Sequence, residues 1–180
     1  MSDTFRTVTL AGIKHSGKST LGRLLAERCG ADFYDIDDVL SEEHHMTTRE
    51  LFRSAGEEKF RSLEAQAVSK IAALDGKKVI SLGGGAVTNS FITEDVWQKL
   101  GTKVMIDVSD EIAEKRVFAN GVPAYLEKYS DPVGALKEIN SARRTEMKKR
   151  CQLVYTADGN LTAEEQSVRF HTFLEQKDIL

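Results

Sequence analysis

The sequence predicts an α/β fold, in which a mostly parallel five-stranded sheet is flanked by helices on both faces. Short apolar runs typical of buried strands alternate with helical segments from one end of the chain to the other. No internal repeat, low-complexity tract or linker interrupts this alternation. With 180 residues the chain is long enough for one domain with a sizeable core, so we expect a single domain over residues 1–180.

The first elements begin this alternation. The apolar run at residues 5–11 predicts a buried strand, and apolar residues at helical spacing predict a helix at 21–28. Gly30 follows that helix as a C-terminal glycine. A second, short strand at residues 32–34 then leads into a cluster of acidic residues.

Helix start and stop residues define the next segment. Thr47 and Glu50 match the capping-box pattern of a helix start, and Gly56 ends that short helix. From residue 57 to 74 the apolar side chains, Leu74 included, share one face of a long amphipathic helix. The remaining expected elements are strands at 79–82, 104–108 and 153–155 and helices at 111–118, 132–150 and 162–174.

Composition narrows the class of protein. A net charge of −3 disfavours a dedicated nucleic-acid binder, and no apolar run approaches the roughly 18 residues that a membrane span needs. The N-terminus lacks the features of a secretory signal, so we expect a cytoplasmic protein with no nucleic-acid or membrane partner. Cys29 and Cys151 are expected to be reduced, buried small residues.

Residues 12–20 have the spacing of a phosphate-binding loop. Gly12 is followed after four residues by Gly17, Lys18 and Ser19, and the stretch lies between the first expected strand and helix. Glycines let several backbone N–H groups point at one anion, while the lysine supplies charge for the β- and γ-phosphates and the serine a hydroxyl for Mg²⁺. A glycine turn with a solvated lysine is the alternative. The nucleotide-binding candidates are Gly12, Lys14, His15, Ser16, Gly17, Lys18, Ser19 and Thr20.

Two further motifs follow strands. Gly83, Gly84 and Gly85 end the third strand, and such a triplet suggests close approach of the backbone to another group, with a flexible turn as the alternative. Asp35 and Asp37 end the second strand. Because ligands of parallel sheets gather beyond the carboxyl ends of the strands, we expect the phosphate loop, the acids and the glycines to share one site.

Four stretches, taken in this order, resemble one known family. They are residues 12–20, Asp35-x-Asp37, Phe60-Arg61 and residues 81–87. In them the chain is similar to the shikimate kinases, which are P-loop enzymes, and the likeness covers nearly the whole chain. The resemblance implies a three-layer P-loop NTPase fold and transfer of the γ-phosphoryl of ATP, with Mg²⁺, to the 3-hydroxyl of shikimate.

The resemblance also implies roles for single residues. Asp35 matches the aspartate near Mg²⁺, where Ser19 is the second metal candidate. Asp37 matches the aspartate that binds the acceptor hydroxyl and helps to remove its proton, so Lys18 and Asp37 are the catalytic candidates. Arg116 matches an arginine that stacks on adenine.

For the acceptor, the resemblance implies two arginines that grip the shikimate carboxylate. Arg61 matches the first, and a guanidinium fork suits a planar carboxylate. Arg143 matches the second, although a shift of one residue would assign it to Arg144. The substrate-binding candidates are Asp37, Arg61, Gly83, Gly84, Gly85 and Arg143.

The chain departs from the family in residues 119–131, which we expect to form a mobile lid. The family usually carries an arginine before the proline of this segment, whereas Val122 precedes Pro123 here. Lys115 or Lys128 could supply the missing charge, although a lysine cannot form a bidentate fork.

We therefore expect a monomeric shikimate kinase whose ligands are ATP, Mg²⁺ and shikimate. Two alternatives remain open. One is a kinase of the same fold that acts on gluconate or a nucleoside, which the presence of Asp37 and Arg61 disfavours. The other is a nucleotide-binding protein that has lost catalysis; the missing lid arginine favours it, and intact Lys18 and Asp35 disfavour it.

Overall fold

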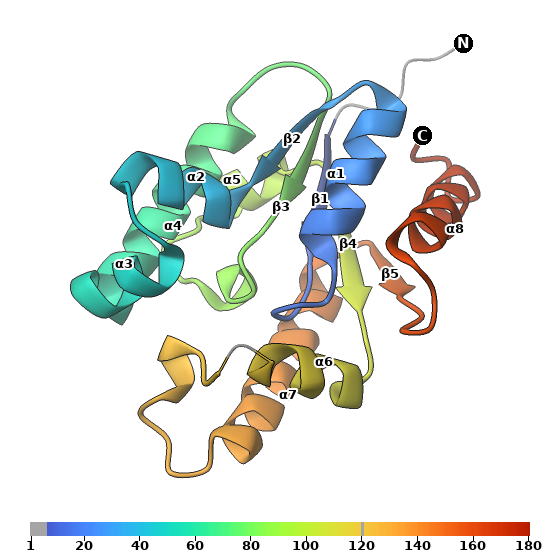
Figure 1. Ribbon diagram of the computed structural model, residues 1–180. Coiled ribbons are helices and arrows are strands. Elements are labelled where there is room, and N and C mark those ends of the chain that lie inside the picture. Colours follow the sequence, from blue (N-terminus) through green and yellow to red (C-terminus); the bar gives the residue numbers. More distant parts are fainter. Residues whose placement is uncertain (1–6, 120) are drawn as a thin grey trace.

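The computed structural model describes residues 7–119 and 121–180, and it contains one five-stranded sheet (Figure 1). All four strand pairings are parallel, in the order β2-β3-β1-β4-β5, which confirms the predicted fold class. Residues 5 and 6 of the first predicted strand lie outside the described residues. The strands are β1 (Thr7–Ala11), β2 (Asp32–Asp35), β3 (Lys78–Ser81), β4 (Thr102–Asp107) and β5 (Leu153–Thr156).

The helices begin and end largely where the caps predict. Thr47 forms a capping box with Glu50, Thr162 forms another, and Gly30 ends the first helix in the left-handed conformation, with φ 59°. The helices are α1 (Lys18–Cys29), α2 (Ile36–His44), α3 (Thr48–Ala55), α4 (Glu57–Ala72), α5 (Glu94–Lys99), α6 (Asp110–Phe118), α7 (Pro132–Arg150) and α8 (Ala163–Glu175), with short 3-10 turns η1 (Ala86–Thr88) and η2 (Ala124–Leu126).

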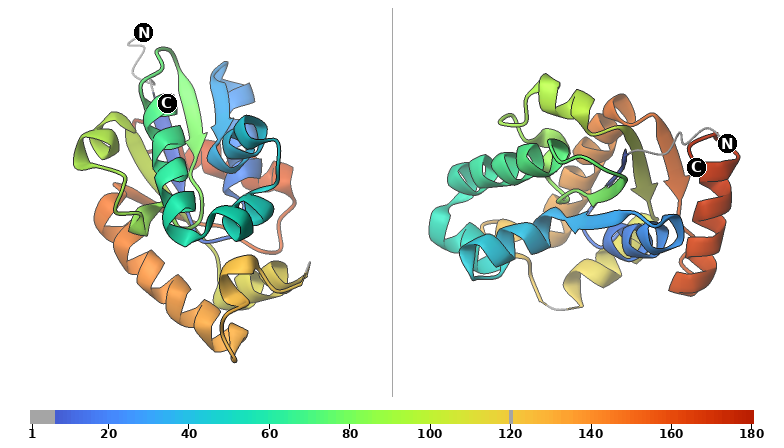
Figure 2. Two further views of the ribbon diagram at one scale, coloured as in Figure 1. Left: turned by 90° about the vertical axis from the view of Figure 1, so that its left-hand side faces the viewer. Right: turned by 90° about the horizontal axis from the view of Figure 1, so that it is seen from above.

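Helices cover both faces of the sheet because strand side chains alternate between the faces. On β4, Val104 and Ile106 pack with α1 and α8, whereas Met105 packs with the helices of the opposite face. Figure 2 shows α1 and α8 together on one side of the sheet and α4, α5 and α7 on the other. The buried strands are apolar on both faces, as a parallel sheet requires.

One helix face differs from the sequence prediction. The helix expected at 57–74 ends at Ala72, and Leu74, predicted to lie on its apolar face, is 40% exposed. Glu64 occupies the inner face instead, where it is 1% exposed. The spacing of apolar residues could not reveal this, because a buried carboxylate stands where a hydrophobic residue is the usual choice.

The loops that follow β1, β2 and β3 lie at the carboxyl edge of the sheet, and α6, η2 and α7 lie beyond that edge (Figure 1). A small hydrophobic cluster of Val117, Leu126, Ala135 and Leu136 joins these outer elements. Arg144 also connects α7 to the sheet, since its Nε donates to Asp107 Oδ1 at 2.8 Å, at the end of β4. Apolar packing among the outer elements and this ion pair therefore hold them at the carboxyl edge of the sheet.

We expect Phe170→Ala to lower the free energy of unfolding by about 3–5 kcal/mol, because Phe170, on α8, is fully buried in the core between that helix, α1 and the sheet. Its ring lies 4.8 Å from that of Tyr155, centre to centre. Urea unfolding measures the change. Val168→Ala, at a position 48% exposed on the same helix, is the control and should change stability by less than about 0.5 kcal/mol. Similar effects of the two variants would contradict this packing.

Candidate active site

The loop between β1 and α1 is shaped by close contacts that only glycine permits. A Cβ on Gly12 would lie 2.5 Å from Ser16 Oγ and 2.6 Å from the Ile106 carbonyl oxygen. Gly17, which caps α1, has φ 97°, and His15 also takes the left-handed conformation. The backbone therefore curls tightly in front of the α1 N-terminus, where the helix dipole favours an anion.

Lys18 is buried in this loop and makes one hydrogen bond, from Nζ to the Ile13 carbonyl oxygen at 3.1 Å. Burial lowers the pKa of its ammonium group, while Asp37 and Asp35 act in the opposite direction. Ser19, the next residue, lies with its Oγ 3.5 Å from Ser81 Oγ at the end of β3. An ammonium group with unused donors and a neighbouring hydroxyl together suit a phosphate and its metal ion.

The acidic pair lies where β2 passes into α2. Asp35 caps the helix, because its Oδ1 accepts a hydrogen bond from the Asp37 backbone N–H at 2.9 Å. Asp37 stands in the wall of a cavity that is open to water. The side chain is exposed to water in the cavity, and partial desolvation by the surrounding walls together with the nearby Asp35 raises the pKa of Asp37 to about 6; Lys18 opposes the rise and Glu64 adds to it.

Arg61 is held by a buried network. Its Nη1 forms an ion pair with Glu64 Oε2 at 3.0 Å, and Asn89 Nδ2 donates to the same carboxylate at 2.9 Å and to the Arg61 carbonyl oxygen at 2.8 Å. Sequence reasoning missed Glu64 and Asn89. The sequence feature that could have indicated the Arg61–Glu64 ion pair is the spacing of three residues, which puts both side chains on one helix face.

The expected close approach at the triple glycine is present, and each glycine approaches a different group. A Cβ on Gly83 would collide with the Glu64 carboxylate, and one on Gly85 with the Arg61 guanidinium. A Cβ on Gly84 would lie 3.1 Å from the backbone nitrogen of Lys14, in the phosphate loop. The triplet thus lies between the phosphate loop and α4.

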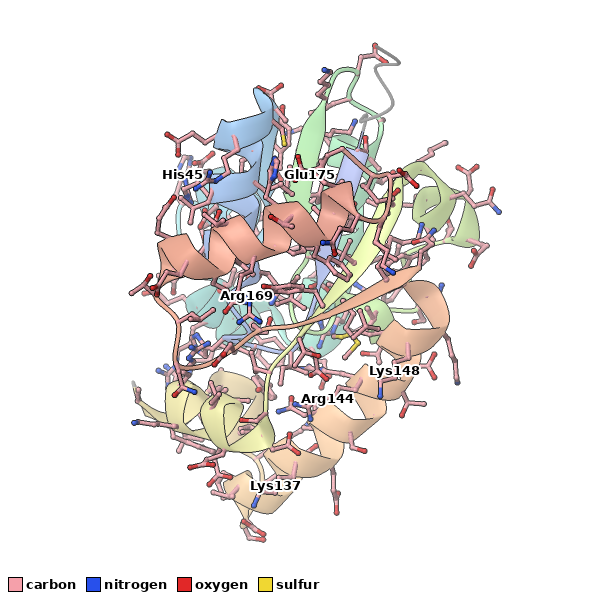
Figure 3. The ribbon with its side chains drawn as sticks, turned by 90° about the vertical axis from the view of Figure 1, so that its right-hand side faces the viewer. His45, Lys137, Arg144, Lys148, Arg169 and Glu175 are labelled. Atoms are coloured by element: carbon pink, nitrogen blue, oxygen red, sulfur yellow. The ribbon has the colours of Figure 1, made fainter. Side chains whose placement is uncertain are left out.

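The two candidate arginines of α7 point in different directions. Arg143 is 7% exposed, has no carboxylate within ion-pair distance among the described residues, and lies over the Tyr125 ring at 5.3 Å. Burial lowers the pKa of Arg143, and the neighbouring Tyr125 partly offsets this. Arg144 instead binds Asp107 and Asp110 on the far side of the helix (Figure 3). Only Arg143 faces the cavity.

A cavity of about 880 Å³ brings most of the candidate residues together. Gly12 and Ser16 do not line it; they are buried and shape the loop from behind. The candidates that line it are Lys14, His15, Gly17, Lys18, Ser19, Thr20, Asp35, Asp37, Arg61, Gly83, Gly84, Gly85, Arg116 and Arg143.

The segment expected to form a lid borders the same cavity; its Asn120 lies outside the described residues. Its Val122 carbonyl oxygen accepts a hydrogen bond from Arg49 Nη2 at 2.8 Å. Arg49, on the first turn of α3, is a cavity-lining residue that sequence reasoning missed. It lies in none of the four stretches that carry the family resemblance, so only the fold reveals that α3 meets this segment.

The parallel sheet, the phosphate loop and the facing acids and arginines define a P-loop phosphotransferase. A family model described as shikimate kinase matches residues 14–175. The chain belongs to the shikimate kinase family.

Individual relatives agree with this assignment. The shikimate kinase of Symbiobacterium thermophilum is 36% identical over 76% of this chain and 78% of its own length. That of Rippkaea orientalis is 33% identical over 87% of this chain and 81% of its own length.

Solved structures show the same fold. Shikimate kinase from Acinetobacter baumannii in complex with shikimate superposes with a TM-score of 0.84 at 21% identity, over 99% of this chain and 97% of that chain. Shikimate kinase from Bacteroides thetaiotaomicron superposes with a TM-score of 0.77 at 26% identity, over 94% of this chain and 98% of that chain.

We expect Asp37→Asn to stabilise the ligand-free protein more at about pH 8 than at about pH 5. The pKa of Asp37 is raised from 3.8 to about 6, so the native state binds this proton more tightly than the unfolded chain does. That advantage is present at low pH and is lost as the pH rises from about 4 to above 6. Urea unfolding at the two pH values measures the difference.

The control is Asp32→Asn, which removes an exposed carboxylate from β2, the strand that precedes Asp37. The difference in stability between the two pH values should change more in Asp37→Asn than in Asp32→Asn. If Asp37→Asn changes stability equally at both pH values, the raised pKa is refuted.

Proposed function

We propose that this protein transfers the γ-phosphoryl group of ATP to the 3-hydroxyl of shikimate. The observation that carries the proposal is a single cavity in which Arg143, buried and without an acid partner among the described residues, stands opposite Lys18 and the phosphate loop. A buried guanidinium without a counter-charge costs free energy unless a ligand supplies an anion. A carboxylated acceptor supplies one.

The acceptor half of the site consists of Asp37, Arg61, Gly84 and Arg143. Arg61 and Arg143 hold the carboxylate, and the network of Glu64 fixes the orientation of Arg61. Asp37 accepts a hydrogen bond from the reacting hydroxyl and takes its proton as the oxygen attacks phosphorus. A pKa of about 6 suits this task, because the carboxylate is ionised near neutral pH yet remains basic enough to take a proton.

The donor half consists of the phosphate loop with Lys18, and Arg116 at its rim. Arg116 Nη1 donates to the His15 carbonyl oxygen at 3.2 Å, which places its guanidinium beside the loop for an adenine ring. Lys18 and the loop N–H groups hold the β- and γ-phosphates. Their charges neutralise the phosphate oxygens before reaction and cost no reorganisation during it.

The residues present suit Mg²⁺ bound through the nucleotide. No group of three or more His, Cys, Asp or Glu side chains among the described residues could hold a metal by itself. Mg²⁺ is commonly held by one or two protein oxygens together with phosphate oxygens, and the Ser19 hydroxyl and Asp35 carboxylate supply such a pair. The ion neutralises charge on the β- and γ-phosphates when it is bound.

We also propose that the protein is a monomer and that it works in the cytoplasm. Within the described residues no helix is both long and apolar enough to span a bilayer. Gel filtration with light scattering tests the monomer, and a mass of about twice that of one chain would contradict it.

The decisive experiment is an assay of ADP release with Mg-ATP and a panel of acceptors: shikimate, gluconate and nucleosides. We expect turnover with shikimate that exceeds turnover with the others by at least about a hundredfold. Preference for another acceptor would identify a kinase of different specificity. ATP binding without turnover on any acceptor would identify a nucleotide-binding protein without catalysis and refute the proposal.

We expect Arg143→Met to raise KM for shikimate by about 10- to 100-fold and to leave ATP affinity unchanged, because it removes charge-assisted hydrogen bonds to the carboxylate. Among the described residues Arg143 has no acid partner, so the variant leaves none of their carboxylates unpaired. Arg144→Met is the matched control, because it removes the arginine that pairs with Asp107 and Asp110. It should lower the free energy of unfolding, while KM for shikimate stays near the wild-type value. The reverse pattern would assign the carboxylate to Arg144.

A further inference from the structure

Arg49 crosses the mouth of the cavity from the first turn of α3 to the segment that precedes α7. One nitrogen, Nη2, makes both of its hydrogen bonds, to the Val122 carbonyl oxygen at 2.8 Å and to Glu127 Oε1 at 2.9 Å. Nε and Nη1 donate to no other group of the described chain. The guanidinium thus keeps unused donors at the wall of the cavity that also contains Lys18.

Glu127 does not need Arg49 as a partner. Arg53, one turn further along α3, donates from Nε to Glu127 Oε2 at 3.3 Å and from Nη2 to Oε1. Two arginines therefore share one carboxylate, and one positive charge is in excess at this point. Arg53 does not line the cavity, whereas Arg49 does.

Three other arginines that line the cavity have partners of their own. Arg61 is paired with Glu64, Arg23 with Asp38 at 3.6 Å, and Arg116 with the phosphate-loop backbone. In the segment that borders the mouth, residues 121–131 contain no arginine. The one lysine there, Lys128, is paired with Glu57 at 3.2 Å.

Arg49 is also electrostatically close to the phosphate loop. Burial is the main cause that lowers the pKa of Lys14, and the positive charges of Arg49 and Arg143 lower it further, against Asp37. Lys14 belongs to the loop whose backbone faces the phosphates. Arg49 and the loop therefore act on the same part of the cavity.

We propose that Arg49 is a catalytic residue that binds the transferring phosphoryl group in the transition state, an inference that rests on the kinase function proposed above. In the step, a bond forms between the acceptor oxygen and the γ-phosphorus, the bond from that phosphorus to the β–γ bridging oxygen breaks, and ADP leaves. The hydroxyl proton passes to Asp37. Negative charge spreads over the three equatorial oxygens of the phosphoryl group. Arg49 donates to two of these oxygens through Nε and Nη1, and Arg53 keeps Glu127.

The test compares Arg49→Ala with Arg53→Ala in the full chain, using steady-state kinetics with Mg-ATP and shikimate. Both variants remove one arginine from Glu127, so they perturb the segment that carries Glu127 in a similar way. We expect Arg49→Ala to lower kcat about a hundredfold or more and to change KM for shikimate and for ATP by less than about threefold. Arg53→Ala should keep kcat within about threefold of the wild type.

Two further measurements separate chemistry from folding. Arg49→Lys should recover only part of kcat, because a lysine keeps the charge without the fork, and added guanidinium ion should restore activity to Arg49→Ala and not to Arg53→Ala. Thermal unfolding shows whether both alanine variants are folded.

Equal losses of kcat in the two alanine variants would mean that Arg49 only holds Glu127, and would overturn the inference. A rise of KM for shikimate alone in Arg49→Ala would make Arg49 an acceptor ligand and would also overturn it. Absence of turnover in the wild type would instead refute the kinase function itself, so the two failures are distinguishable.

Discussion

The backbone of residues 83–85 is the constraint on which the site depends. It runs between the phosphate loop and α4 with no room for a Cβ at Gly83 or Gly85, while Gly84 approaches the backbone of Lys14. In the proposed reaction, the donor half of the cavity belongs to that loop and much of the acceptor half to α4. The backbone of residues 83–85 therefore lies directly between the two elements, with no side chain of its own to hold them further apart. In-line transfer between two bound substrates needs their spacing to be precise.

The close contact between residues 83–85 and α4 also explains why the Arg61–Glu64 ion pair is buried there. Arg61 must present its guanidinium to the cavity from a helix that packs against the core, and its side chain is only 18% exposed. Glu64 and Asn89 satisfy the charge and fix the rotamer. A buried ion pair adds little net stability, because desolvation offsets most of its Coulomb energy. Its contribution here is the orientation of Arg61, which leaves part of the fork directed at a ligand.

The sequence was sufficient for the features that local chemistry decides. Parallel strands follow from apolar runs separated by helices, the helix ends follow from caps such as Thr47 and Gly30, and the phosphate loop follows from glycine spacing. Contacts between segments far apart in the chain could not be predicted. Glu64 is a polar residue on a buried face, and Arg49 meets Val122 across 73 residues, so neither has a local pattern. The choice between Arg143 and Arg144 likewise depends on which side of α7 faces the sheet edge and which faces the cavity.

The ligand-free cavity contains three charges that the protein leaves poorly satisfied. Lys18 is buried with one hydrogen bond, Arg143 is buried without an ion-pair partner in the described chain, and Asp37 has a pKa raised toward neutrality. Among the described residues, neither Lys18 nor Arg143 forms an ion pair with Asp37, although all three line one cavity. In the proposed function, a nucleotide phosphate pairs with Lys18, a carboxylate with Arg143 and a hydroxyl with Asp37, so the binding of both substrates stabilises the folded protein. On that proposal the site discriminates against ligands that lack the phosphate or the carboxylate, because such a ligand leaves the buried Lys18 or Arg143 unpaired.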